Sequence, residues 1–386
     1  MTLLVALMVT SQLAITIFLP SMPSMAEDLG TSQALIQMTV SAYLGAFAIA
    51  QLVIGPLSDA IGRRRPLLAG ILLFTLASIA CALAPDIETL ITARIVQAIG
   101  GCTCLALGRA IVRDTTDGPA ATRAMAYLGM ALALAPIFAP LIGGQLQVLF
   151  GWEANFLFIA GAGWLTLAAT YLTLQETLPR VARRPAQAGA LARSYVRLLG
   201  MVHFMGYCLS SASMGGAFQA FIAGSPIALI VVMGLSPEEY GWFILEVPFG
   251  YVVGNFISSR LSQRIPRERM ILTGGLVAST ATCSAMVLSL TGMDTPVTLI
   301  VPMFFYAVGS GFLIPNALSG ALTSVEPASA GAAAAVSGFL QMGAGFLATV
   351  AIAALVQSSY LQVGGVMFCC TMLSWLIFLA LGTRRT

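Results

Sequence analysis

The sequence predicts an all-α membrane protein in which twelve transmembrane helices form two halves of six. Composition is the first observation behind this prediction, because 58% of the 386 residues are hydrophobic and only 9% are charged. Soluble domains carry about 25% charged residues. Spacing is the second, because the charges cluster between apolar runs of the roughly 20 residues that a helix needs to cross a bilayer. No hydrophilic stretch is long enough to form a separate soluble domain.

Twelve spans result when the chain is divided at its Pro, Gly and charge clusters. They cover approximately residues 3–23, 33–56, 65–84, 88–110, 121–147, 152–175, 198–227, 239–260, 269–290, 296–322, 331–356 and 361–382. The first span has no basic segment before it and no small-residue cleavage site after it. We therefore expect a retained helix rather than a signal peptide.

The positions of the arginines predict how the spans are oriented. All 18 Lys and Arg positions are arginines, and all except Arg94 fall in alternate connections or at the end of the chain. They are Arg63, Arg64, Arg65, Arg109, Arg113, Arg123, Arg180, Arg183, Arg184, Arg193, Arg197, Arg260, Arg264, Arg267, Arg269, Arg384 and Arg385. The opposite connections hold acids, namely Glu27, Asp28, Asp86, Glu88, Glu153, Glu238, Glu239 and Asp294. Positive loops stay in the cytoplasm, so we expect both termini and residues 176–197 to be cytoplasmic.

An internal repeat predicts the domain organisation. "GPLSDAIGRRRPLLAG" (55–70) and "GNFISSRLSQRIPRERMILTGG" (254–275) each begin with Gly, pass through an Arg-rich turn and re-enter the membrane. Two parallel repeats joined by a basic linker are a plan of one large class of transporters. We therefore expect an N-terminal half over 1–175, a cytoplasmic linker over 176–197 and a C-terminal half over 198–386.

Several motifs resemble the major facilitator superfamily. Gly55-Pro-Leu-Ser-Asp59 followed by Gly62-Arg-Arg is similar to its signature between spans 2 and 3, and Arg94-x-x-Gln97-x-x-Gly100 resembles its span 4 motif. "APIFAPLIGG" (135–144) resembles the span 5 signature of its antiporters. "RAIVRD", "AGSPIAL", "PNAL" and "GFLQMG" are similar to the bicyclomycin-resistance (Bcr/CflA) group of drug efflux proteins. The resemblance covers essentially the whole chain and implies the major facilitator fold.

Eight residues are predicted to act in gating. They are Asp59, Arg63, Arg113, Asp114, Pro136, Pro140, Gly143 and Gly144. The resemblance implies a charge network in which Asp59 pairs with Arg63 or Arg113, although Ala60 replaces a frequent basic residue. In span 5, small residues recur every four positions from Ala131 to Gly143, which permits close approach of another helix, and the prolines bend the span. The alternatives are membrane anchoring by the arginines and ordinary tight packing in span 5.

Glu246, in "GWFILEVPFG" (241–250), is the single carboxylate expected within the membrane. In span 1, Thr16 stands where the family usually has an Asp that titrates protons and pairs with the span 4 Arg. An ionisable residue at the centre of a span costs about 2.5–3.5 kcal/mol on insertion scales, so Arg94 and Glu246 are functional candidates. At 1.5 Å per residue, both lie roughly 10 Å below the outer surface. Pro248 can free a backbone carbonyl beside the acid.

We hypothesise that Glu246 is the proton-coupling residue and that Arg94 controls its protonation. Burial raises the pKa of a carboxyl group and a nearby Arg lowers it, so movement between the halves would change the proton affinity. Two alternatives remain open, since Glu246 could extend to the outer headgroups or serve only as a structural hydrogen-bonding group.

The sequence therefore predicts a bacterial inner-membrane antiporter that expels lipophilic drugs in exchange for protons by alternating access. The substrate-binding residues are expected to be Arg94, Thr16, Tyr43, Gln51, Gln219, Glu246, Tyr306 and Asn316. A metabolite or sugar exporter without proton coupling is the alternative that Thr16 leaves open, and a membrane sensor is a third. We expect no enzyme, because no nucleophile–base or metal constellation occurs, and no cofactor, metal or nucleic acid. Lipids surround the expected monomer.

Overall fold

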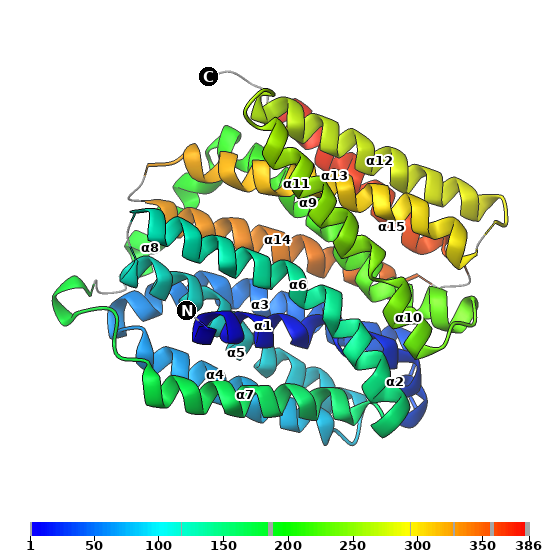
Figure 1. Cartoon of the computed structure of the whole chain (residues 1–386), viewed down its shortest axis with the longest axis horizontal. Coiled ribbons are helices and arrows are strands. Elements are labelled where there is room, and N and C mark those ends of the chain that lie inside the picture. The colour runs from blue at the N-terminus through cyan, green and yellow to red at the C-terminus, as the bar shows by residue number, and fades with distance from the viewer. Residues whose placement is uncertain are drawn as a thin grey trace.

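The computed structural model describes residues 2–116, 118–183, 188–293, 295–326, 329–355 and 359–382. These residues are almost entirely helical, and no strand occurs among them (Figure 1). Four residues used to predict the orientation lie outside this set, namely Arg184, Asp294, Arg384 and Arg385. The side chains of Arg123 and Ala131 lie outside it as well.

Two groups of long helices make up the bundle, and a linker helix lies between them in sequence. The N-terminal group contains α1 (Thr2–Thr16), α2 (Met22–Asp28), α3 (Gln33–Ile61), α4 (Arg64–Ala82), α5 (Ile87–Thr115), α6 (Gly118–Phe150) and α7 (Glu153–Thr173). The linker helix is α8 (Ala188–Leu199). The C-terminal group contains α9 (Val202–Pro226), α10 (Pro237–Phe243), α11 (Glu246–Leu261), α12 (Arg267–Leu290), α13 (Pro296–Thr323), α14 (Ala330–Ala353) and α15 (Leu361–Ile377). Four short helices complete the set. η1 (Leu19–Ser21) and η2 (Arg180–Ala182) are 3-10 helices, and η3 (Ile227–Val232) and η5 (Phe378–Gly382) are π-helices that continue α9 and α15.

Ten helices in the described part of the chain are long and apolar enough to cross a membrane. Each begins and ends within a few residues of an expected span. The expected span over 121–147 corresponds to α6, in whose described part Phe138–Phe150 is a shorter apolar helix. The expected span over 239–260 corresponds to α10 and α11, which have 7 and 16 residues. The structure thus bears out the all-helical, many-span architecture, and the count of twelve stays a prediction.

The expected span 239–260 is broken rather than continuous. α10 ends at Phe243 and α11 begins at Glu246. The cause is Pro248, because it has no N–H to donate to the Ile244 carbonyl four residues earlier. That carbonyl instead accepts from the Val247 N–H at 3.4 Å, a bond that spans only three residues.

The same close helix crossing occurs once in each group. A Cβ added at Gly100 of α5 would lie 2.6 Å from the Gly70 carbonyl oxygen of α4. A Cβ at Gly309 of α13 would lie 2.5 Å from the Gly274 carbonyl oxygen of α12. Only glycine allows either pair of helices to approach so closely. The two crossings occupy corresponding places, because each joins the third and fourth expected spans of its half.

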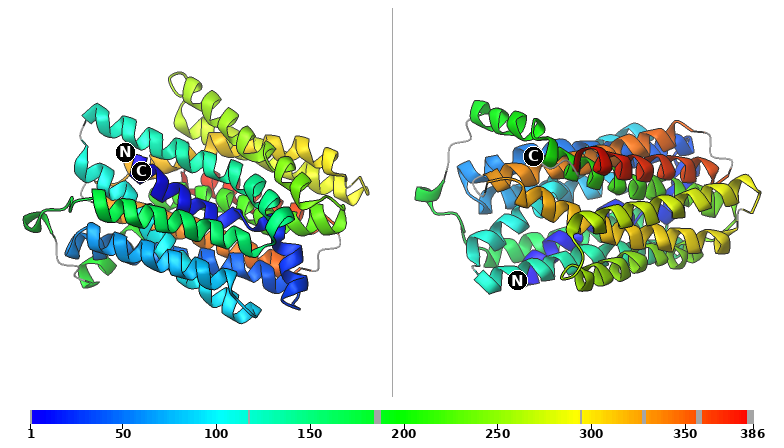
Figure 2. Two further views of the ribbon diagram at one scale, coloured as in Figure 1. Left: turned by 60° about the horizontal axis from the view of Figure 1, so that its bottom comes forward. Right: turned by 90° about the horizontal axis from the view of Figure 1, so that it is seen from above.

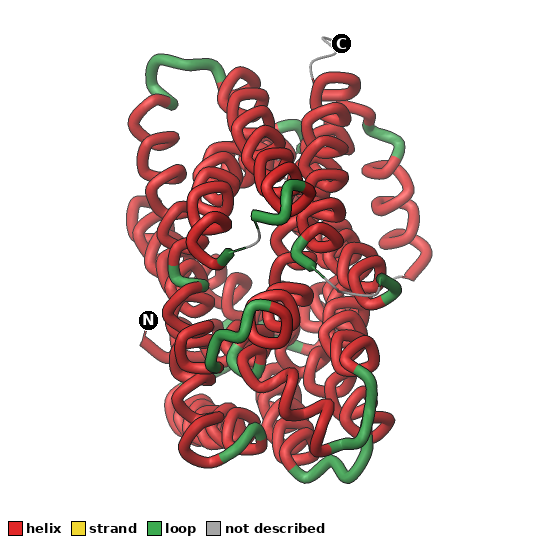
Figure 3. The backbone as a smooth tube through the Cα atoms, turned by 90° about the vertical axis from the view of Figure 1, so that its right-hand side faces the viewer, coloured by secondary structure: helices red, strands yellow, loops and turns green. Residues whose placement is uncertain are grey.

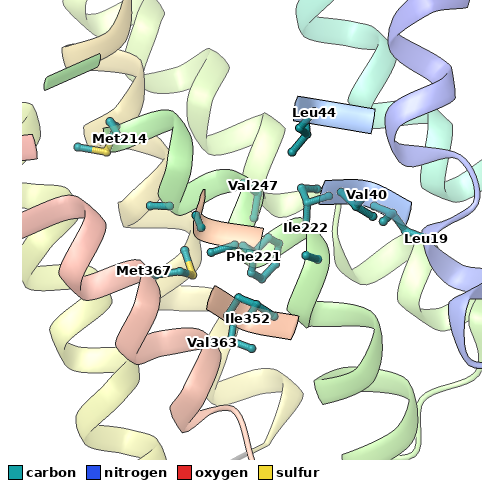
Figure 4. Packing of buried hydrophobic residues seen from close by; sticks show 14 of the residues in the cluster. Leu19, Val40, Leu44, Met214, Phe221, Ile222, Val247, Ile352, Val363 and Met367 are labelled. Atoms are coloured by element: carbon teal, nitrogen blue, oxygen red, sulfur yellow. The ribbon is translucent and has the colours of Figure 1, made fainter. Parts of the chain in front are cut away.

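The two groups meet along α3 and α14. Ser41 donates to Thr349 Oγ1 at 2.8 Å, and further along the same pair of helices Gln51 lies against Gly338. Apolar side chains of both groups also join one cluster, in which Val40 of α3 lies near Ile222 of α9 (Figure 4).

The two ends of the bundle differ in charge, and we name them accordingly. The Arg-rich end carries α8 and the connection between α3 and α4 that contains Arg63. The acid end carries α2 and α10 with Glu27 and Glu238 (Figures 1 and 2). Figure 3 shows the bundle from the acid end, along the helices. α6 approaches the C-terminal group at the acid end, where it contacts α10, and α6 and α11 separate toward the Arg-rich end (Figures 1 and 2).

Candidate functional site

Arg94 is the centre of a buried polar site in the N-terminal group. Its side chain is 0% exposed. Nη1 donates to the Ala14 carbonyl oxygen at 2.8 Å and to Gln97 Oε1 at 2.5 Å. Gln97 is fixed in turn, because its Nε2 donates to Ser78 Oγ at 2.8 Å. Residues of α1, α4 and α5 therefore hold one side of the guanidinium together.

Three aromatic rings surround the guanidinium. Its central carbon lies 4.4 Å from the ring centroid of Tyr43, 4.5 Å from that of Phe18 and 5.9 Å from that of Phe156. A desolvated cation–π contact contributes about 2 kcal/mol. Tyr43 is thus the predicted substrate residue that the structure brings against Arg94.

The last turn of α1 supplies a backbone acceptor to Arg94. α1 ends at Thr16 because Pro20 has no N–H for the Thr16 carbonyl. Carbonyl groups in the last turn of a helix lack intrahelical partners and carry partial negative charge. Ala14 belongs to that turn, and its carbonyl accepts the bond from Arg94. The buried Thr16 hydroxyl has no hydrogen-bond partner among the described residues.

Arg94 forms no ion pair with any carboxylate in the described part of the chain, where the ion pairs involve Arg63 and Arg183 instead. Within the same part, its Nε and Nη2 also have no hydrogen-bond partner. A buried charge without full partners is costly. The site therefore holds two guanidinium nitrogens, Nε and Nη2, whose N–H groups have no acceptor among the described residues.

Glu246 is the first residue of α11 and is partly buried. Its Oε1 is enclosed and has no hydrogen-bond partner among the described residues, and the structure does not pair it with Arg94. Of the residues that share its helical stripe, Gly250 and Gly254 pack on α13, but Trp242 is 60% exposed. The stripe therefore faces other helices over only part of its length.

The remaining polar candidates contact other groups. The Tyr306 hydroxyl donates to the Met214 carbonyl at 3.1 Å, and Asn316 Nδ2 donates to Ser258 Oγ at 2.8 Å. Gln219 is buried against Gly345, and its Oε1 has no partner among the described residues. These side chains are not joined to Arg94 by any hydrogen bond that the structure shows, so their role in substrate binding stays a prediction.

A charge network at the Arg-rich end is centred on Arg63. Nη1 lies 2.6 Å from Asp59 Oδ1, and Nε donates to Asp114 Oδ2 at 2.8 Å. Arg113, the other partner that the sequence suggested for Asp59, is exposed. The residue of α5 that contacts Arg63 is its neighbour Asp114. The network therefore joins α3, α4 and α5 within the N-terminal group.

Glu176, which sequence reasoning missed, extends this network. Its Oε1 accepts from the backbone N–H of Arg63 at 2.8 Å and from that of Leu178 at 3.1 Å. Burial acts to raise the pKa of the Glu176 carboxyl, but these hydrogen bonds outweigh it and the pKa lies below its ordinary value. The sequence did contain an indication of this role, because Glu176 is an acid directly after the expected span 152–175 in a connection that is otherwise rich in arginine.

Glu176→Gln is expected to lower the stability of the purified protein by about 1 kcal/mol at neutral pH. The carboxylate has a depressed pKa in the folded state, so its stabilising effect is complete above the unfolded pKa of about 4.3 and is lost as the pH falls through the folded pKa. Thermal unfolding in detergent should show a gap between the two proteins that narrows below about pH 4. Glu27→Gln, at an exposed acid, is the control, and a gap independent of pH would contradict the assignment.

The acid end is closed by close backbone contact between α6 and α10. A Cβ added at Gly144 would lie 2.6 Å from the Pro237 carbonyl oxygen, and one at Gly241 would lie 3.0 Å from that of Pro140. Gly143 packs in the same way on the carbonyl of Ile17. Pro136, further toward the middle of α6, is partly buried. Three of the four predicted gating residues of span 5 therefore lie at a contact that involves α1 or the C-terminal group.

Gly144→Val is expected to reduce transport by at least roughly tenfold, because a branched side chain at this position forces α6 and α10 apart. The measurement is flux through the protein in liposomes, with thermal unfolding measured in parallel. Gly129→Val is the matched control, since a Cβ there meets no atom within 4 Å. Equal flux in the two variants would show that this contact does not contribute to the cycle.

Membrane-length helices that surround a buried, partly unsatisfied arginine define a polytopic membrane transporter. The chain belongs to the major facilitator superfamily, whose sequence profile matches residues 4–349. This confirms the resemblance drawn from the motifs.

Similar proteins extend over the full length. Multidrug resistance protein D of Escherichia coli (strain K12) is 30% identical over 385 residues, which cover 100% of this chain and 96% of that protein. The bicyclomycin resistance protein homolog of Haemophilus influenzae is 25% identical and covers 96% and 93% of the two chains. The crystal structure of a D-xylose–proton symporter superposes with a TM-score of 0.82 at 15% identity, covering 98% and 96%, and this likeness shows the fold alone.

Proposed function

We propose that this protein exports lipophilic drugs across the bacterial inner membrane in exchange for protons, by alternating access. Relatives named for multidrug and bicyclomycin resistance support the substrate class. The observation that carries the proposal is Arg94, a fully buried cation with two nitrogens whose N–H groups have no acceptor among the described residues. Such a group is retained at a cost in stability, as expected of a binding residue.

The proposed frame is twelve spans in two halves, 1–175 and 198–386, joined by the linker 176–197. α6 and the pair α10–α11 would be the two spans beyond the ten of membrane length. The matching crossings at Gly100 and Gly309 support the repeat. The Arg-rich end would be cytoplasmic, as the distribution of arginines favours, and the protein would act as a monomer.

In this frame the arrangement described here would be an inward-facing one. α6 and α10 touch at the acid end through Gly144 and Gly241, whereas α6 and α11 separate toward the Arg-rich end (Figure 1). A drug would enter between the halves from the Arg-rich end and reach Arg94. Opening the acid end would require the Gly144 and Gly241 contacts to separate while the Arg-rich end closes.

Glu246 is the proposed coupling acid. It is partly buried, and it has an oxygen without a partner in the described residues. It also begins α11, the helix directly after α10, which contacts α6. A carboxyl group at this place gains or loses a proton according to whether α10 seals it from the acid end. Arg94 would influence it only in a state where the two approach, because they are unpaired here.

A metabolite or sugar exporter without proton coupling is the second candidate. The observation in its favour is that the end of α1, rather than an acid at position 16, faces Arg94. The test is transport in liposomes with and without a pH gradient, using a panel of drugs and a panel of sugars. Accumulation of several drugs that requires the gradient supports the first candidate, and gradient-independent flux of sugars alone supports the second.

A further inference from the structure

The Leu52 carbonyl of α3 lacks its usual partner. In an α-helix this oxygen accepts from the N–H four residues later, but that residue is Pro56, which has no N–H. The oxygen accepts instead from the Tyr195 hydroxyl at 2.9 Å. Tyr195 belongs to α8 and lies 143 residues further along the chain. A polar group left free inside the N-terminal group is thus satisfied by the linker helix.

α8 is itself attached to the C-terminal group. Leu198 is 3% exposed and belongs to the same hydrophobic cluster as Phe204 of α9. Only Gly200 and Met201 separate α8 from α9, and α8 also contacts α14. α8 therefore follows the C-terminal group when that group moves, and the Tyr195 hydroxyl holds it to α3.

The surroundings of Tyr195 favour its role as a donor. Burial first, and the Asp59 carboxylate second, raise the pKa of the Tyr195 hydroxyl above its ordinary value, so the proton stays on the oxygen. Asp59 is the acid that pairs with Arg63. The bond from Tyr195 to Leu52 therefore lies beside the charge network of the Arg-rich end.

We propose that Tyr195 is a positioning residue of the transport cycle, which latches the linker helix α8 to α3 by docking on the carbonyl that Pro56 leaves free. The latch rests on the proposed function only in that alternating access moves the groups relative to each other. Movement of α3 against α8 beyond about 3.5 Å from oxygen to oxygen breaks the bond. The latch therefore stabilises the arrangement described here against any arrangement in which α3 and α8 have moved apart.

The test measures the populations of the two arrangements directly. Spin labels on cysteines introduced at the exposed Arg65 and Arg264, in a chain whose native cysteines are replaced, report the separation of the two groups by double electron–electron resonance. Tyr195→Phe keeps the ring and removes the donor. It is expected to lower the population of the arrangement described here, relative to the other, by roughly two- to tenfold. Tyr171→Phe, at an exposed tyrosine of the same end, is the control and should leave the distances unchanged.

A second substitution separates the latch from simple packing. Pro56→Ala gives position 56 an N–H that bonds the Leu52 carbonyl within α3, so this oxygen no longer depends on Tyr195 and the bond from Tyr195 contributes less. In this background Tyr195→Phe should have little further effect, which is the signature of coupling in a double-mutant cycle. Equal shifts in both backgrounds, or no shift in either, would overturn the proposal. Because neither drug nor pH gradient is used, these outcomes are independent of whether the protein exports drugs.

Discussion

Arg94→Met is expected to abolish drug transport and to leave the protein at least as stable as the natural chain. Methionine approximately fills the volume of the arginine stem but offers no N–H to a ligand. Removal of a buried cation that lacks an ionic partner is neutral or stabilising when an apolar side chain takes its place. The two measurements are drug flux in liposomes and thermal unfolding of the purified protein.

Two variants sharpen this test. Arg94→Lys keeps the charge but loses the Nε and Nη2 donors, which are the two nitrogens without partners here, so roughly tenfold slower flux is expected. Arg65→Met removes an exposed arginine at the Arg-rich end and should transport normally. If Arg94→Met transports at the natural rate, the guanidinium has no part in transport. If instead it unfolds at a much lower temperature, Arg94 is a structural residue.

Glu246→Gln is expected to uncouple transport from the pH gradient without stopping it. Glutamine is close in shape to a protonated glutamate, so the drug pathway stays intact while the titrating group is lost. One pH unit corresponds to about 1.4 kcal/mol per proton, or about tenfold accumulation if one proton is exchanged for each drug molecule. The natural chain should reach that ratio in liposomes, whereas the variant should only equalise the drug concentrations.

Glu238→Gln is the matched control for this substitution. Glu238 is an exposed acid of α10, eight residues before Glu246, and its removal should leave accumulation unchanged. A Glu246→Gln variant that still accumulates drug in response to the gradient, alongside an inactive Arg94→Met variant, would show that the coupling acid lies elsewhere.

Most of the fold could be predicted from the sequence, because a bilayer sets the length of apolar helices and arginines mark their ends. The break before Glu246 was foreshadowed by Pro248, but a proline indicates a freed carbonyl and not whether the helix bends or stops. α8 was not anticipated. It is a short amphipathic helix whose polar face resembles a connecting loop in composition, and its place depends on a contact with Leu52 far away in sequence.

The candidate site was predictable in part. Arg94 and Glu246 stand out because charges are rare in apolar runs, and Tyr43 was named among the substrate residues. The Ala14 partner of Arg94 could not be found in the same way, since its carbonyl is a backbone group and its availability depends on where α1 ends. Glu176 was missed for a related reason, because its partners are backbone N–H groups that any residue type could provide.

The contact between Arg94 and the end of α1 has a consequence for cargo selection. An acid at position 16 would cancel the guanidinium charge when ionised and expose it when protonated, so the electrostatic potential at the centre of the protein would vary with pH. The end of α1 supplies only a fixed partial charge, which does not titrate. The positive charge of Arg94 is therefore not cancelled by a titrating group on α1. At an effective dielectric constant of about 20, a unit charge 8 Å away contributes about 2 kcal/mol. We therefore expect permanently cationic compounds to bind less well than neutral or anionic ones by that amount.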